Sequence, residues 1–213
     1  ILKSSPKFGD HLSAYVEGRF MAQDLSHGAR NGNGRTASVT EPLQIELREG
    51  YVSIFAGDLE LRAGKQIIVW GRADEINPTD WLSPRDYTLL FPDAYDSRFG
   101  AVSLRADYYV TPTWKLEGVW LPIPTVSTIP LPSTLAMSEQ IPEIRWKNME
   151  GAFKLDHSGG DVDFSASYFT GFNRTPEIQV VGFAPGPTPI PGLTHHRIQG
   201  VGGDFATTWG HWG

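Results

Sequence analysis

The chain has 213 residues, with 18 lysines and arginines against 24 aspartates and glutamates, so its formal net charge is −6. That balance argues against a nucleic-acid partner, because a surface that binds phosphate groups must be basic. Aromatic residues form 12% of the chain, which excludes a disordered protein, and the 23 glycines and 16 prolines disfavour a helical bundle.

Eight segments alternate apolar and polar residues with the period of two that is typical of β-strands. In chain order they are residues 11–23, 43–55, 59–70, 98–110, 114–122, 145–156, 161–172 and 196–207. Each has about nine to thirteen residues, whereas strands of soluble sheets usually have five or six. A tilted strand needs about nine to eleven residues to cross a bilayer, so these lengths favour a transmembrane sheet.

The connections between these strands alternate between short and long. The short ones are residues 56–58, 111–113 and 157–160, and the long ones are roughly residues 24–42, 71–97, 123–144 and 173–195. Short periplasmic turns and long extracellular loops are typical of outer-membrane barrels. The sequence therefore predicts an all-β fold, an antiparallel up-and-down transmembrane β-barrel. Residues 1–213 would form this barrel domain or its N-terminal portion.

We expect the eight strands to belong to a larger barrel, because the interior of an eight-stranded barrel is filled by its own side chains. Aromatic residues lie near both ends of the strands, as in the girdles at the two lipid interfaces. Phe20, Trp70, Phe99, Trp120, Trp146 and Phe172 lie beside long loops, and Phe55, Tyr108, Tyr109 and Trp114 lie near short turns. Aromatics are also common in strands of every kind.

The polar face of the predicted strands carries charges of both signs. The residues that we expect to line the lumen are Glu17, Arg19, Glu49, Arg62, Arg105, Asp107, Lys115, Glu117, Glu150 and Lys154. Alternation of apolar and polar residues does not by itself show which face of the sheet contacts water, because a soluble barrel or sandwich also alternates, with its apolar side inward. Loop asymmetry and strand length favour a lumen filled by ion pairs. The opposite face would then contact lipid, through Val102, Leu104, Ala106, Phe153, Leu155, Val162, Phe164 and Ala166.

Residues 71–97 form a long connection with signals of local order. Ser83 followed by Pro84 predicts a helix start, and Pro92 would end that helix near Phe91. The apolar residues Trp81, Leu82 and 89–91 would leave an exposed patch unless the segment packs on the barrel. We therefore expect an ordered loop that packs on the polar lumen face and narrows it. Its constriction residues would be Arg72, Asp74, Asp80, Trp81, Arg85 and Asp86. The two arginines lie among the aspartates, and we expect them to fix the loop by charge-assisted hydrogen bonds.

Three sequence stretches support a family resemblance: LREGYVSIFAGDLELRAG at residues 47–64, GKQIIVWGRAD at residues 64–74 and INPTDWLSPRD at residues 76–86. Over about residues 43–110 the chain resembles an uncharacterised proteobacterial family of outer-membrane β-barrels with porin-like architecture. The resemblance implies an outer-membrane location and a barrel considerably longer than this chain. It implies no catalytic residues.

The sequence contains no motif that would position residues for catalysis or for binding a metal. No G-x-S-x-G arrangement positions a serine nucleophile, and the chain contains no cysteine, so we expect no catalytic residues and no cofactor. His195 and His196 are adjacent and would point apart on a strand, which disfavours a shared metal with His27. The glycines at positions 200, 202 and 203 indicate a strand that bends or lies against bulky neighbours.

The sequence thus predicts a channel or exporter for a small molecule in the bacterial outer membrane, with the lipid bilayer as its partner. One alternative is a structural barrel that anchors or sheathes a protein partner in the outer membrane or periplasm and conducts nothing. The other is a soluble β-sandwich or lipocalin-like binding protein with its apolar face inward.

Overall fold

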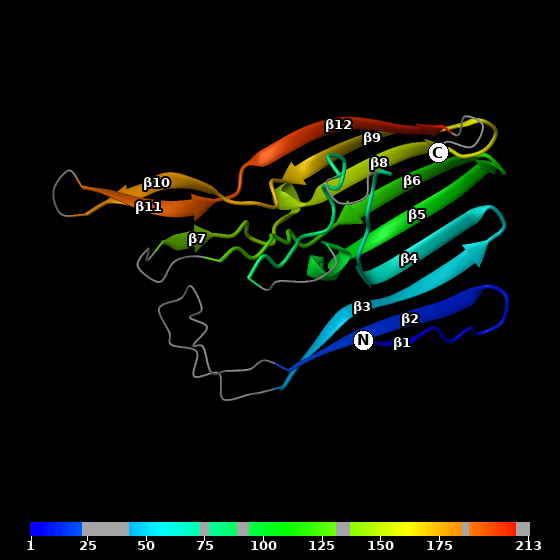
Figure 1. Cartoon of the computed structure of the whole chain (residues 1–213), viewed down its shortest axis with the longest axis horizontal. Helices are drawn as coiled ribbons and strands as arrows, with labels where there is room; N and C mark the ends of the chain where they lie inside the picture. Colours follow the sequence, from blue (N-terminus) through cyan, green and yellow to red (C-terminus); the bar gives the residue numbers. More distant parts are fainter. Residues whose placement is uncertain (23–42, 73–76, 89–93, 131–136, 185–187, 208–213) are drawn as a thin grey trace.

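The computed structural model describes residues 1–22, 43–72, 77–88, 94–130, 137–184 and 188–207. Nine antiparallel strands form one large sheet, which Figure 1 shows as a curved wall, and no α-helix occurs in these residues. In sheet order the nine strands are β1 (Leu2–Ser4), β2 (Leu12–Ala22), β3 (Leu43–Ala56), β4 (Leu59–Gln66), β5 (Ala101–Thr111), β6 (Trp114–Leu121), β8 (Glu150–His157), β9 (Val162–Phe172) and β12 (Arg197–Thr207). The predicted all-β, antiparallel class is confirmed.

All eight predicted strands are present, and each pairs with its predicted neighbour in chain order. Three boundaries differ from the prediction by three residues or more, the first being the start of β5, which lies at Ala101 rather than at residue 98. Strand β4 ends at Gln66 rather than at residue 70, and β8 begins at Glu150 because Trp146–Asn148 form a 3-10 helix, η2. Within the described ranges β1 and β12 are the two edges of the sheet, and no ladder joins them.

A second, three-stranded sheet lies in the long connections, where alternation predicted no strands. It consists of β10 (Glu177–Phe183) and β11 (Pro189–Thr194), which pair antiparallel, and β7 (Ser138–Gln140), which runs parallel to β11. Figure 1 shows β10 and β11 extending beyond the end of the large sheet.

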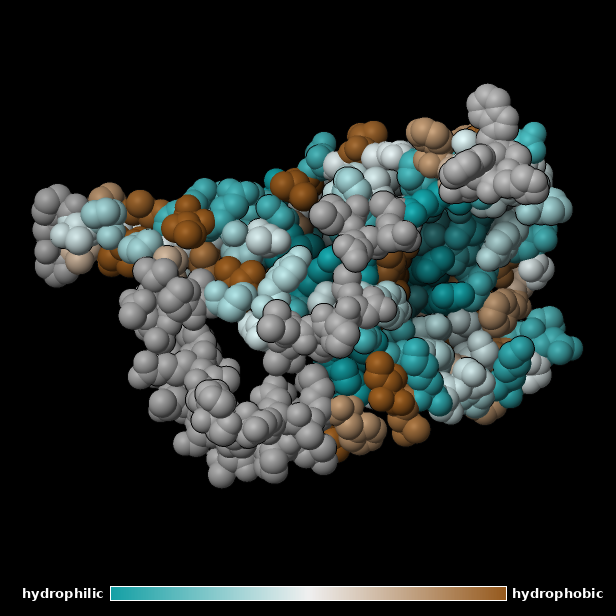
Figure 2. Space-filling view, in the orientation of Figure 1, coloured by the Kyte–Doolittle hydropathy of each residue, from teal (hydrophilic) through white to brown (hydrophobic). Residues whose placement is uncertain are grey.

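The large sheet buries its polar face and exposes its apolar face. Charged and hydroxyl side chains such as Glu117 and Ser165 are buried, while Val102, Leu104 and Phe153 on the other face are more than two-fifths exposed. Figure 2 shows a recess with a mostly hydrophilic lining and hydrophobic residues along its rims. A sheet whose open side faces water has the reverse pattern, because its apolar side chains are buried and its polar side chains are exposed.

Strand β3 contains a β-bulge that changes which residues face inward. Glu17 pairs with Glu49, but the next residue, Gly18, pairs with Leu47, so Arg48 is the extra residue. Both Arg48 and Glu49 are consequently buried, although strict alternation would place them on opposite faces. The sequence carries a trace of this bulge, because the exposed apolar residues change from odd positions (Ile45, Leu47) to even positions (Val52, Ile54).

After β4 the chain leaves the wall and folds over the polar face (Figure 1). The Ile67 N–H donates to Glu49 Oε1, and the Trp70 indole N–H donates to Glu117 Oε1 on β6, 2.8 Å away. Ile68, Trp70 and Leu82 form an apolar core with wall residues Val119, Leu121 and Phe169. Residues 67–72 and 77–86, which we call the inserted segment, therefore lie on the polar face of the sheet.

The helix predicted from Pro84 is absent over residues 84–88, where Arg85 forms a bridge with Arg98 and Asp86 with Thr128. The expected cap is engaged elsewhere: the Ser83 hydroxyl accepts a hydrogen bond from the Ile68 N–H and donates to the Ile68 carbonyl. A short 3-10 helix, η1 (Ala94–Ser97), follows later in this connection. Phe91 and Pro92 lie outside the described residues.

Two members of the predicted aromatic girdle do not lie on the exposed face. Trp70 and Phe172 are buried, Trp70 in the core beneath the inserted segment and Phe172 at the end of β9. Phe20, Trp120 and Tyr108 are exposed as a girdle requires. Position along a strand, which the sequence provides, does not say whether an aromatic ring points inward.

Candidate functional site

The polar face carries ion-pair clusters that join neighbouring strands. In the first, Arg48 lies between Glu17, 2.9 Å away, and Asp96 of η1, 3.1 Å away. The Arg48 guanidinium also lies 4.9 Å from the ring centre of Tyr95, and burial raises the pKa of that phenol. The cluster therefore ties strands β2 and β3 to the connection that precedes β5.

The second cluster spans β5 and β6. Arg105 pairs with Asp107 at 2.8 Å and with Glu117 at 3.2 Å, and Lys115 contacts the same two carboxylates. Asp107 and Glu117 are almost fully buried, so this group is a charged network within the recess. Such networks are stabilising only when every charge has a partner.

All ten predicted lumen residues lie on the polar face. Those not yet placed have their own contacts: Arg19 with Glu46 (2.7 Å), Arg62 with Glu60 (2.6 Å), Glu150 with Arg174 (2.8 Å) and Lys154 with Asp156 (3.6 Å). Seven of them are buried, namely Glu17, Arg19, Glu49, Asp107, Glu117, Glu150 and Lys154. The structure brings them into several separate clusters rather than one site.

Asp80 and Asp86, two of the predicted constriction residues, contact different partners. Asp80 is buried and receives hydrogen bonds from Arg85 at 2.8 Å and from Arg98 at 2.6 Å, so the expected Arg85–Asp80 pair is present. Asp86 instead accepts hydrogen bonds from Thr88 of its own turn. Asp74 lies outside the described residues.

Arg72 fixes the loop by charge-assisted hydrogen bonds, as predicted, and among the described residues its partners lie in the wall rather than in its own loop. It contacts three carboxylates of the wall: Asp156 of β8 at 2.9 Å, Asp163 of β9 at 3.3 Å and Asp204 of β12 at 2.8 Å. These aspartates lie toward the short-turn end of their strands, so the chain between β4 and Arg72 runs along the recess away from the long loops.

Trp81 packs against the wall at β12, where glycines make room for it. A Cβ built at Gly200 would lie 3.0 Å from the Trp81 ring, and one built at Gly202 would lie 2.6 Å from Thr79 and 2.9 Å from Trp81. The prediction that the glycines of this strand lie against bulky neighbours is confirmed for Gly200 and Gly202, whereas a Cβ at Gly203 would meet only the Ser165 carbonyl oxygen, 3.1 Å away. On its other side Trp81 stacks on Phe169, with ring centres 6.1 Å apart.

The sequence pattern did not indicate three arginines of the site, Arg48, Arg98 and Arg174. Arg48 was missed because of the bulge, and Arg98 because β5 begins at Ala101 and not at the predicted residue 98. Arg174 was missed because it lies in a connection, where no periodicity indicates a direction. Arg174 follows β9 and contacts Glu150, the Trp81 carbonyl and the Thr125 carbonyl. It thereby joins the inserted segment to two other parts of the chain.

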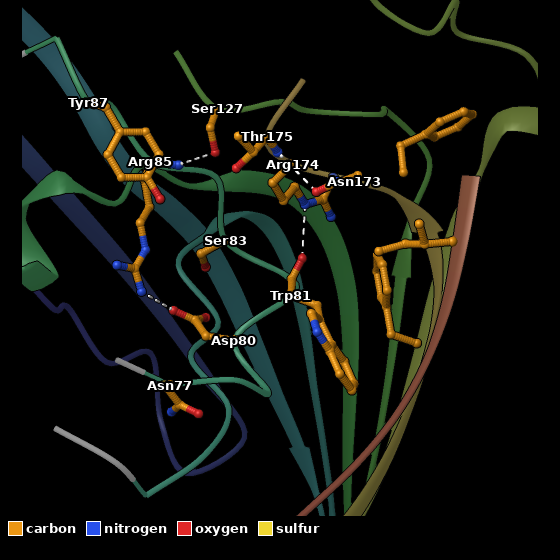
Figure 3. A pocket seen from close by; sticks show the side chains of 13 residues that line it. Asn77, Asp80, Trp81, Ser83, Arg85, Tyr87, Ser127, Asn173, Arg174 and Thr175 are labelled. Carbon is orange, nitrogen blue, oxygen red and sulfur yellow. Dashed lines mark hydrogen bonds and ion pairs between the residues drawn. The ribbon is translucent and has the colours of Figure 1, made fainter. Parts of the chain in front are cut away.

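A pocket of about 280 Å³ opens between the inserted segment and the end of β9 (Figure 3). The inserted segment contributes Asn77, Asp80, Trp81, Ser83 and Arg85, and the next residue, Tyr87, also lines the pocket. The rest of the pocket lining comes from Ser127, from the end of β9 with the residues after it, and from the start of β12. The residues of these last two parts are Phe169, Phe172, Asn173, Arg174, Thr175 and Ile198. It combines aromatic surface with charged groups, as small-molecule sites do.

The two adjacent histidines are engaged by separate partners in the small sheet. His195 is buried between the Asn173 carbonyl, 2.8 Å away, and Glu139, 3.0 Å away, whereas His196 contacts Gln179. They therefore do not converge on one point. His27 lies outside the described residues.

None of the helical segments in the described part of the chain has the length and apolarity needed to span a membrane. Comparison of the chain with protein-family models, curated proteins and solved structures found no match.

Proposed function

We propose that this chain forms the wall of a bacterial outer-membrane β-barrel channel for a small molecule, narrowed by the inserted segment. The observation that carries this proposal is the inversion of the large sheet, which buries charge and exposes apolar side chains. The eight residues expected to contact lipid all lie on its outer face, whereas Arg105 and Asp107 lie inside. A water-soluble sandwich with its apolar side inward would have the opposite arrangement.

The inserted segment supports a constricted channel. It lies on the polar face and is held there by Asp80, Trp70 and Arg72, so it occupies space that a pore would otherwise leave open. Strands of eight to fourteen residues and the alternation of short and long connections agree with a barrel wall.

Single-channel recording in planar bilayers tests this function. We expect the intact barrel to which these strands belong to require detergent for extraction and to form pores, and deletion of residues 74–94 to raise their conductance. Deletion of residues 179–191 is the matched control, because it shortens the small sheet, which extends beyond the wall, and should leave conductance unchanged.

Three outcomes would contradict the proposal. Solubility without detergent would support the binding-protein alternative. Membrane insertion without conductance, together with a stoichiometric partner on purification, would support the structural barrel. Equal conductance with and without residues 74–94 would show that the inserted segment does not narrow the pore.

A further inference from the structure

We propose that a basic turn at the long-loop end of the large sheet binds the phosphate of an anionic lipid headgroup. This turn, residues 143–149, directly precedes β8, and Arg197 of β12 holds it in place. The inference rests on the proposed function in one respect, that the outer face of the sheet contacts a bilayer.

Hydrogen bonds to backbone carbonyls fix the basic turn. Within it the Asn148 side chain donates to the Glu143 carbonyl at 2.8 Å. From β12 the Arg197 guanidinium donates to the Lys147 carbonyl at 2.9 Å and to the Met149 carbonyl at 3.0 Å. These bonds order the turn without engaging the side chain of Lys147.

Arg197 reaches the basic turn from the apolar outer face of the sheet. Residues separated by an even number of positions in a strand face the same side, so Arg197 shares a face with Val201 and Phe205. Those two residues are 83% and 76% exposed. Because the turn precedes the first residue of β8, it lies at the long-loop end of that face. A headgroup layer would meet the apolar surface of a barrel at such an end.

Trp146 has the chemistry of an interfacial residue. Its exposed fraction is 82%, and that of Ile144, two positions before it, is 68%. In water, so much exposed apolar surface on an ordered turn is unfavourable. At the level of the lipid headgroups an amphipathic indole ring is favoured instead. The exposure of Trp146 therefore agrees with a turn that lies in the headgroup layer.

The charges of the basic turn favour an anion. Arg145, Lys147 and Arg197 are accompanied by one carboxylate, that of Glu143, which leaves two net positive charges. The Arg145–Glu143 pair is exposed on both sides, and Lys147 has no ion-pair partner among the described residues. A phosphate can therefore approach the cations from outside. Basic groups beside a bilayer attract anionic lipids in this way.

Fluorescence quenching tests the assignment in the intact barrel, reconstituted in phosphatidylcholine vesicles with about one-fifth phosphatidylglycerol. The chain contains no cysteine, so Ile144→Cys provides a single site for a bimane label beside the basic turn. In separate samples one of the two lipids carries a nitroxide near its headgroup, which quenches the label when that lipid is its neighbour.

We expect phosphatidylglycerol to be preferred about tenfold over phosphatidylcholine at this label. Each of the two net charges is worth up to about fivefold near an anionic surface, and salt screens part of that effect. Added salt should reduce the preference further.

One variant and a second label position locate the contact. Lys147→Gln removes a charge and keeps the backbone bonds of the turn, so the preference should fall about threefold to fivefold. Lys7→Gln is its matched control, because Lys7 is also exposed and lies beside the start of β2, at the other end of the wall. A label on Val162→Cys, at the short-turn end of the outer face, should be quenched by both lipids without preference.

Several results would overturn the inference. Equal quenching by the two lipids at the Ile144→Cys label would remove the preference for an anionic headgroup. Quenching at Val162→Cys with none at Ile144→Cys would place the basic turn outside the headgroup layer. An unchanged preference in Lys147→Gln would assign it to other groups, and its loss on addition of inorganic phosphate, but not of chloride at equal ionic strength, would indicate a simple anion site.

Two further results separate this inference from the proposed function. Absence of quenching at both labels would contradict the contact with a bilayer, on which both proposals rest. A barrel that prefers phosphatidylglycerol at the basic turn but conducts nothing would contradict the channel alone and leave the lipid site standing.

Discussion

Buried charge is the main feature of this protein at the scale of single residues. Arg48 has a side-chain exposure of 1%, and so does its partner Glu17, and their closest N–O distance is 2.9 Å. A surface pair such as Arg145–Glu143, at 60% and 68% exposure, has an even shorter distance of 2.6 Å. Distance alone therefore does not show which ion pair interacts more strongly. Burial does, because water does not screen the buried Arg48–Glu17 pair.

Replacement of Arg48 with alanine should lower the free energy of unfolding by about 3 kcal/mol, the low end for breaking a buried ion pair, because Glu17 keeps only the exposed Lys3 and the Tyr15 hydroxyl as partners. Urea titration in detergent, followed by tryptophan fluorescence, measures this change. Arg145→Ala is the control and should cost less than about 1 kcal/mol. Similar losses in both variants would mean that the polar face is open to water.

The close approach of Trp81 to β12 leads to a second residue-scale prediction. Gly202→Val should push Trp81 and Thr79 off the wall, since a Cβ there already comes within 2.6 Å of Thr79. The chain lacks cysteine, so Ser83→Cys provides a single reporter at a buried position of the inserted segment.

We expect maleimide labelling of that cysteine to be faster in Gly202→Val than in the parent. Gly118→Val should have no such effect, because a Cβ at Gly118 meets no atom within 4 Å. Unchanged labelling in both variants would show that β12 does not hold the inserted segment in place.

At the scale of elements, the inserted segment is held by charge at two points and by apolar packing on either side of them. Arg72 anchors the segment to β8, β9 and β12, and Asp80 anchors it to Arg98. Ile68 and Trp70, before Arg72, and Leu82, after Asp80, pack in the apolar core. Removal of a charged anchor should therefore loosen the inserted segment while the large sheet stays folded.

Arg72→Gln should make amide hydrogen exchange in residues 67–72 and 77–84 about tenfold faster, equivalent to about 1.4 kcal/mol of opening free energy. Three carboxylates would then face one another without a cation close to all of them. Mass spectrometry of peptic fragments measures the exchange, with Arg197→Gln as the control. High salt should narrow the difference, because Arg72 is partly exposed. Faster exchange throughout β8 and β9 would instead point to general unfolding.

At the scale of the whole molecule, the exposed apolar face of the large sheet allows a test of the proposed contact with lipid. Leu104 lies near the middle of β5 with 42% of its surface exposed, opposite Ala63 and Trp120 on the neighbouring strands. In water such a position tolerates a charge, whereas at the midplane of a bilayer a charge is costly.

Leu104→Arg should therefore destabilise the chain assembled in lipid vesicles by about 2–4 kcal/mol, measured by urea unfolding. Ile178→Arg is the control, because Ile178 is a similarly exposed apolar residue in β10, outside the large sheet. A neutral effect of Leu104→Arg, equal to that of the control, would indicate that the exposed face contacts water.

The sequence by itself determined the eight long strands, their order and the division of their side chains between two faces. Period-two alternation is a property of neighbouring residues, so it needs no knowledge of distant contacts. The ten polar residues assigned to one face lie on that face, and two of the three glycines of β12, Gly200 and Gly202, lie against a bulky ring. The predicted helix failed because its capping serine, Ser83, bonds to a residue 15 positions away.

Only the tertiary structure decided how the connections lie on that framework. Arg72 meets Asp204 across 132 positions of sequence, and Arg174 meets the Trp81 carbonyl across 93, distances over which no local pattern operates. The pocket likewise draws its lining from three connections and two strands. Periodicity says which face a strand residue occupies, but the partner of a loop residue depends on where the wall places the opposing charge.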